Sequence, residues 1–173
     1  MYHVSPLRGL QKLDPTYKAE VSLGKEKVLF FSPYPEFAIA FMVRPDALFR
    51  GRYAHSNYDG ITWCLVVDDE EKLRGALGKG GSLYRVSGEF TPYPKAGVGN
   101  LVQVSTGLVE VLEEESWDTA LAAMLHYKLR ICILPAGTFD TFSSLSEEEQ
   151  QRILEGAELA PEGIFHVRAL KTS

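Results

Sequence analysis

Cysteine is scarce in this sequence, and no cluster of cysteine and histidine residues has the spacing of a zinc site. The two cysteines, Cys64 and Cys132, each lie inside an apolar run. Cysteines in such runs are normally buried, reduced thiols that behave as small apolar side chains. The sequence therefore predicts two reduced thiols and no metal site.

Long apolar runs are also missing. No stretch approaches the roughly 20 apolar residues of a membrane-spanning helix. The first residues lack the basic, apolar and small-residue regions of a signal peptide. We therefore expect a cytoplasmic protein with no membrane partner.

Positive charge is not in excess either. The chain has 18 Lys and Arg against 23 Asp and Glu, a formal net charge of −5. Because phosphate contacts need a basic face, this balance argues against nucleic acid as the main partner. There is also no glycine-rich phosphate loop of the G-x-G-x-x-G or Walker type. The glycines around Lys79 lack the strand-to-helix setting that such a loop requires.

The composition is that of one globular domain. The chain has 173 residues, of which 45% are hydrophobic, and this length favours a single domain over residues 1–173. Short strand patterns and a few helix patterns follow one another without regular alternation, which is typical of the α+β class. The spacing of Leu7, Leu10 and Leu13 predicts a brief helical turn, and residues 135–143 read as a loop.

Residues 136–173 form a C-terminal extension to a core of residues 1–135. Ser146 and Glu149 have the spacing of a capping box, so a surface helix is expected to begin there. Residues 164–170 predict a last strand. This strand either completes the sheet of the core or pairs with another subunit.

Two stretches near the start suggest a binding site. Residues 2–6 and 28–41 each read as a strand running into a turn. His3 and Ser5 lie at the end of the first strand, and Ser32 and Tyr34 at the end of the second. If the two strands pair, these hydroxyl and imidazole groups converge and suit sugar hydroxyls. Tyr34 and Phe37 offer flat faces for a planar ring, so a nucleotide such as NAD would fit.

Five segments carry a family resemblance: YHVSPLRGLQKLDP, VLFFSPYPEFAIAF, SLYRVSGEF, VQVSTGLVEVLEEESWDTAL and KLRICIL. They resemble a group of bacterial and phage proteins with a YHVSP-type start. That group is similar to the ADP-ribosyltransferase fold of diphtheria-toxin-like and poly-ADP-ribose-polymerase-like enzymes. The resemblance covers residues 1–135 and implies two small packed, mostly antiparallel sheets with short flanking helices.

The resemblance also implies roles for individual residues. A first-strand histidine binds a ribose hydroxyl of NAD, which matches His3. A tyrosine near the second strand stacks on nicotinamide, and Tyr34 is the nearest match, with Ser32 at the strand end. A glutamate on a later strand acts at the ribose. The matching strand, 101–105, has no acid, so either Gln103 takes that position or Glu110 reaches in from the next strand. Glu89 is a further candidate acid.

Two functions follow from these assignments. In the first, an enzyme cleaves NAD at the nicotinamide–ribose bond and passes ADP-ribose to a macromolecular acceptor or to water. In the second, a catalytically degenerate member keeps the fold as a nucleotide-binding or protein-interaction module. The missing acid favours the second, because glutamine cannot supply the negative charge that a developing cation needs.

Overall fold

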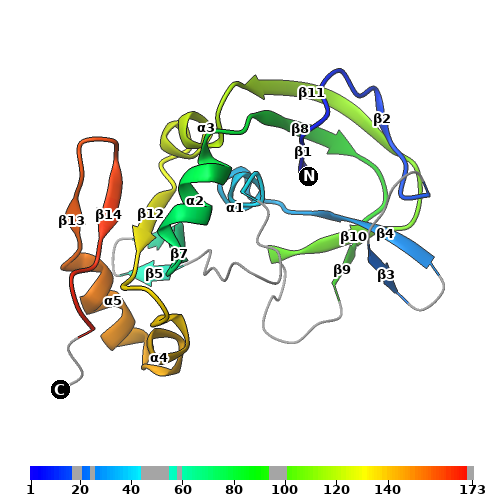
Figure 1. The fold of residues 1–173 in the computed structure, drawn as a ribbon. Helices are drawn as coiled ribbons and strands as arrows, with labels where there is room; N and C mark the ends of the chain where they lie inside the picture. The colour runs from blue at the N-terminus through cyan, green and yellow to red at the C-terminus, as the bar shows by residue number, and fades with distance from the viewer. Residues whose placement is uncertain (17–20, 24–25, 44–54, 58–59, 94–100, 171–173) are drawn as a thin grey trace.

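A computed structural model describes residues 1–16, 21–23, 26–43, 55–57, 60–93 and 101–170. The protein belongs to the α+β class, as predicted, and is built from small, mostly antiparallel sheets and a few short helices (Figure 1). The described residues form three four-stranded sheets and a two-stranded hairpin. This arrangement differs from the two packed sheets that the family resemblance implied. The hairpin consists of β5 (His55–Asn57) and β6 (Gly60–Thr62).

The first sheet contains β1 and is antiparallel throughout, in the order β1-β8-β11-β2. Its longest strand, β11, carries an irregularity between Val111 and Glu113, where the register with β8 shifts. Its strands are β1 (Tyr2–Ser5), β8 (Gly81–Ser87), β11 (Val109–Trp117) and β2 (Lys12–Leu13).

Residues 6–11 form the connection between β1 and β2, where the sequence predicted a helical turn. That prediction is wrong: Leu13 is buried in a strand, whereas Leu7 is half exposed. The backbone of this connection bonds to the sheet instead of to itself. The Tyr84 hydroxyl lies 2.8 Å from the Leu7 carbonyl oxygen, and Glu114 accepts from Gly9 N–H.

The second sheet has the order β3-β4-β10-β9 and is joined to the first at one point. Tyr2 and Ser32 exchange two backbone hydrogen bonds, with N···O distances of 2.8 and 3.0 Å. β4 therefore lies between β10 and the beginning of β1. The strands are β3 (Val21–Leu23), β4 (Glu26–Phe31), β10 (Gln103–Ser105) and β9 (Thr91–Pro92).

The third sheet contains the parallel strands, which the sequence did not predict. Its order is β13-β14-β12-β7, and β12 pairs in parallel with both β14 and β7. Continuous apolar runs in β7 and β12 suit strands that are buried on both faces. The bounds are β7 (Cys64–Val67), β12 (Arg130–Ile133), β13 (Glu158–Leu159) and β14 (Ile164–His166).

Helices cover both faces of the third sheet (Figure 1). Leu65 and Ile131 face the largest buried cluster, which also takes in side chains of the first three helices. Cys64 and Cys132 face the other way, toward Phe142 of the fourth helix. The helices are α1 (Pro35–Ala40), α2 (Glu70–Leu77), α3 (Ala120–His126), α4 (Phe139–Ser144) and α5 (Glu147–Glu155).

The largest cluster joins distant parts of the chain. It includes Ile39 of α1, Leu83 of β8 and Ile164 of β14, each at most 2% exposed. Because β14 also pairs with β12, residues 164–166 complete a sheet begun by the core strands. Within the described ranges, no helix has the length and apolar character needed to cross a membrane.

Candidate functional site

The junction of β1 and β4 brings His3 against the second sheet. His3 Nδ1 lies 2.8 Å from the carbonyl oxygen of Phe30, and its ring centroid lies 5.4 Å from that of Phe31. β1 pairs along its length with β8, and it meets the second predicted strand only through one antiparallel bridge, Tyr2–Ser32. As a result, the end of β4 meets the beginning of β1, where Tyr2 pairs with Ser32, and Ser5 lies at the opposite end of β1.

A row of side chains crosses the two joined sheets through His3. Side chains of residues directly opposite in neighbouring strands lie on the same face. Gln103 is opposite Phe31, His3 is opposite Tyr84, and Tyr84 is opposite Glu114. The contact between the rings of His3 and Phe31 connects the two halves. We call this set the His3 row: Gln103, Phe31, His3, Tyr84 and Glu114.

Gln103 is the member of the His3 row that the sequence identified on β10. It is 8% exposed and lies directly opposite Phe31 on the neighbouring strand. The strands that carry His3 and Gln103 therefore flank β4 on either side. The structure brings these two predicted residues to one face of the sheet, separated by Phe31.

Ser32, Tyr34 and Phe37 lie elsewhere. Ser32 shares the face of Tyr2, which is opposite to that of His3, and its Oγ accepts from Tyr34 N–H at 3.1 Å. The Tyr34 ring is 39% exposed and its centroid lies 5.2 Å from that of Trp63. Phe37 is 5% exposed and packs between Trp63 and Phe41, so it is a core residue.

The candidate acids named from the sequence are not near His3. Glu110 is opposite Ser87 on β8, an odd number of residues from Tyr84, so it points to the other face of the sheet. Glu89 is exposed and follows the end of β8. Neither carboxylate belongs to the His3 row.

Glu114 is the carboxylate that sequence reasoning missed. Both of its oxygens lie 3.0 Å from Gly9 N, and Oε1 lies 2.7 Å from Ser82 Oγ, 3.0 Å from the Tyr84 hydroxyl and 3.1 Å from Ser116 Oγ. Hydrogen bonds from Ser82 and Gly9 hold the pKa of this carboxyl below its usual range. Burial raises the pKa of Tyr84. The run of three glutamates in the sequence gave no sign of which one faces inward.

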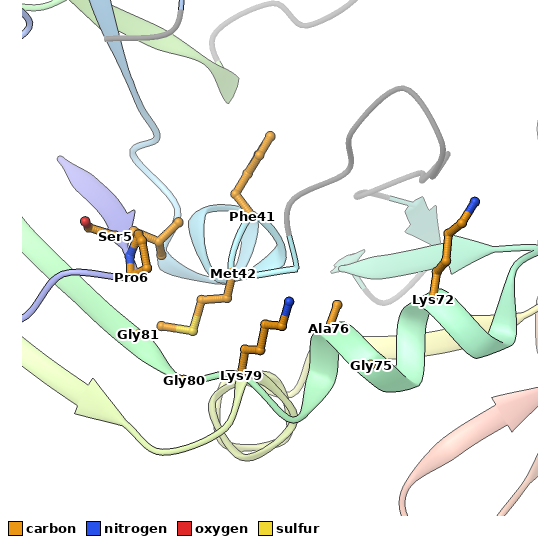
Figure 2. Close-up of a pocket in the computed structure, with 11 residues that line it drawn as sticks. Ser5, Pro6, Phe41, Met42, Lys72, Gly75, Ala76, Lys79, Gly80 and Gly81 are labelled. Carbon is orange, nitrogen blue, oxygen red and sulfur yellow. The ribbon is translucent and has the colours of Figure 1, made fainter. Parts of the chain in front are cut away.

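A cavity of about 790 Å³ opens beside the end of β1 (Figure 2). It is bordered by α1 on one side and by α2 and the turn after it on the other. Ser5 is the only predicted site residue that lines it, and its Oγ accepts from Leu7 N–H at 3.2 Å. The other lining residues are Val4, Pro6, Phe41, Met42, Lys72, Gly75, Ala76, Lys79, Gly80 and Gly81.

The described side chains include no group of three or more His, Cys, Asp and Glu residues that could hold a metal ion. Cys64 and Cys132 are buried, and contact with Cys64 together with burial raises the pKa of the Cys132 thiol. Comparisons with protein-family models, with curated proteins and with solved structures found no match for this chain.

Proposed function

We propose that this protein binds NAD or a related nucleotide, as an ADP-ribosyltransferase-like module that does not cleave its ligand. The observation that carries the proposal is the junction at which β1 meets β4, the strand that pairs with β10, through the Tyr2–Ser32 bridge and the contacts of His3 with Phe30 and Phe31. The resemblance assigns the histidine, the tyrosine and the acid to these three strands. His3 and Gln103 lie on the same face, on opposite sides of Phe31 of β4.

The surroundings of His3 suit a ribose hydroxyl. In the neutral ring, a proton on Nδ1 bonds to the Phe30 carbonyl oxygen, which makes Nε2 the acceptor nitrogen. The carbonyl also fixes the orientation of the ring. An amide side chain such as that of Gln103 can both donate to and accept from a second sugar hydroxyl.

The carboxylates support binding without turnover. Cleavage of the nicotinamide–ribose bond builds up positive charge, which a nearby carboxylate would stabilise. Gln103 carries no charge, and Glu110 points to the other face of the sheet. Glu114 shares the face of His3, but its oxygens are surrounded by donors from its own chain.

A transferase is the second candidate, because Glu114 and His3 do lie in the same row with only Tyr84 between them. In that case release of the connection of residues 6–11 would uncover the carboxylate. NAD would then be cleaved, and ADP-ribose would pass to a macromolecular acceptor or to water.

Thermal unfolding with and without NAD tests the proposal. NAD at about 100 times its dissociation constant should stabilise the wild type by about 2.7 kcal/mol. We expect His3→Asn to lose most of this shift, because asparagine keeps an amide nitrogen near the position of Nδ1 but has no group at Nε2. Each variant is compared with its own ligand-free melting temperature. Glu110→Gln, on the opposite face, is the matched control and should keep the shift.

A nicotinamide-release assay separates the two candidates. Binding without turnover predicts a stability shift and no nicotinamide. Release that disappears in Glu114→Gln, while the shift remains, would favour the transferase. No shift at millimolar NAD, or equal shifts in wild type and His3→Asn, would refute binding at the His3 row.

A further inference from the structure

The cavity beside the end of β1 carries a second inference, independent of the nucleotide proposed at the His3 row. We propose that it binds a small organic anion that combines a planar aromatic ring with a negatively charged group. Its volume of about 790 Å³ lies within the range of ligand pockets, roughly 300–1,000 Å³. Its walls come from segments that are far apart in the sequence: the end of β1, the two residues that follow α1, and α2 with the turn after it.

The apolar part of the cavity is supplied mainly by the end of α1. Phe41 caps the C-terminal end of α1 and is 37% exposed, although the last four residues of that helix are buried, and Met42 beside it also lines the cavity. Phe41 continues an aromatic contact chain, because its ring centroid lies 5.3 Å from that of Phe37. A planar ring placed against Phe41 would extend this chain and cover exposed apolar surface.

The charged part comes from α2 and the turn after it. Figure 2 shows the side chains of Lys72, Lys79 and Phe41 pointing to the same side of the cavity. Lys72 is held by Asp69, with an Nζ–Oδ2 distance of 3.0 Å. Among the residues that the structure describes, no carboxylate pairs with Lys79. An ammonium beside an apolar wall, on a chain of net charge −5, attracts an anion with an apolar body.

Glycine keeps the cavity open on the side of α2. A Cβ atom added at Gly75 would meet no atom within 4 Å, so the space there is empty. Glycine inside a helix costs about 0.5–1 kcal/mol relative to alanine. Gly75 therefore offers a position where a larger side chain can fill the cavity without a clash in the fold.

The probe for the test is 8-anilinonaphthalene-1-sulfonate, an aromatic anion whose fluorescence rises in an apolar site. We expect the folded wild type to bind one molecule per chain. Gly75→Leu should weaken binding at least tenfold by occupying the cavity, and Lys79→Gln should weaken it about tenfold through loss of the charged donor.

Two matched variants serve as controls. Gly78→Leu places the same side chain in equally open space just after α2, outside the cavity lining. Lys12→Gln removes a positive charge from β2, which is also outside the lining. Both should bind the probe as the wild type does. Thermal unfolding first shows that each variant is folded at the temperature of the assay. Probe fluorescence then does not come from core residues exposed in unfolded protein.

Competition distinguishes the sources of the anion. Displacement of the probe by adenosine monophosphate would indicate a nucleoside phosphate, and displacement by benzoate an aromatic carboxylate. Displacement by laurate alone would overturn the choice of a planar ring. Equal probe affinity in the wild type, Gly75→Leu and Lys79→Gln would overturn the site itself. Because His3 does not line the cavity, His3→Asn should leave probe binding unchanged, so this result is separate from the NAD test.

Discussion

Glu114 holds residues 6–11, the segment between β1 and β2, against the first sheet. Its carboxylate faces Gly9 N–H and the hydroxyls of Ser82, Tyr84 and Ser116. Gly9 has a φ of +71°, a backbone conformation that glycine adopts at no steric cost. The hydroxyl groups of Ser82 and Tyr84 belong to fully buried residues, and each bonds to the Glu114 carboxylate as well as to one neighbour, Ser116 Oγ or the Leu7 carbonyl oxygen.

Glu114→Gln should destabilise the protein by about 0.5–1.5 kcal/mol at pH 7, because glutamine keeps one acceptor oxygen but loses the second acceptor and the charge that strengthens these hydrogen bonds. Urea unfolding followed by tryptophan fluorescence gives the value. Glu110→Gln, four residues earlier on the same strand but on the other face, should change stability by less than about 0.5 kcal/mol. Equal effects of the two substitutions would show that Glu114 does not hold the connection.

The stability of the wild type and that of Glu114→Gln should also depend differently on pH. The folded pKa of Glu114 lies below its ordinary value of 4.5, so its contribution to stability is present above pH 4.5 and is lost as the pH falls through the folded value. The stability difference between wild type and Glu114→Gln should then shrink as the pH is lowered below 4.5. A difference that stays constant from pH 7 to pH 3 would contradict this assignment.

At the scale of single elements, α5 is the clearest case of a local signal. Ser146 Oγ lies 3.4 Å from Glu149 N, and Glu149 Oε2 lies 3.0 Å from Ser146 N, so the predicted capping box is confirmed. Ser146→Ala should cost about 1 kcal/mol, the usual effect of losing a serine N-cap. Thermal unfolding measures it. Ser144→Ala, in the last turn of α4, removes only a hydroxyl bonded to the Thr141 carbonyl and should have a smaller effect.

Other elements were missed because their signals are not local. α4 begins without a side-chain cap of its own, and Phe139 N–H bonds instead to Asp68 Oδ2, 71 residues away. Residues 135–143 therefore read as a loop in the sequence. The apolar runs around Cys64 and Cys132 become β7 and β12, but their parallel pairing depends on residues such as Cys64 and Arg130 meeting across the fold. In the same way, the spacing of the leucines in residues 6–13 could not reveal that Tyr84 and Glu114 bind that backbone.

At the candidate site, too, local signals were read correctly and features that depend on distant residues were missed. The sequence identified His3 and Gln103, because each lies on a strand with a recognisable pattern. It did not identify Glu114, because the shift in register after Val111 decides which of the three glutamates shares the face of Tyr84. It also grouped Ser5 and Ser32 with His3, whereas antiparallel pairing separates these residues along β1 or across the sheet.

At the scale of the whole molecule, the largest buried cluster should make unfolding cooperative. Ile164 lies in the last strand, is 1% exposed and belongs to the same buried cluster as side chains of α1 and β8. Ile164→Ala should destabilise the protein by about 2–5 kcal/mol, the usual cost of such a truncation in a core. Circular dichroism and tryptophan fluorescence should report the same single transition.

Leu159 provides the control for this prediction. It lies on the neighbouring strand β13 and is 63% exposed, so Leu159→Ala should change stability by less than about 0.5 kcal/mol. Two separate transitions in Ile164→Ala, one for each optical probe, would mean that the third sheet unfolds independently of the other two.

The position of β1 between β4 and β8 also has a consequence for the order of folding. β1 is synthesised before β8, yet His3 pairs with Tyr84, about 80 residues later in the chain. Contacts between residues so far apart are slow to form because the intervening chain must first be ordered. Until β8 has been synthesised, β1 has an open edge where β8 will later pair, and open edges favour aggregation. Slower translation of the residues between β1 and β8 would lengthen the time during which this edge is open.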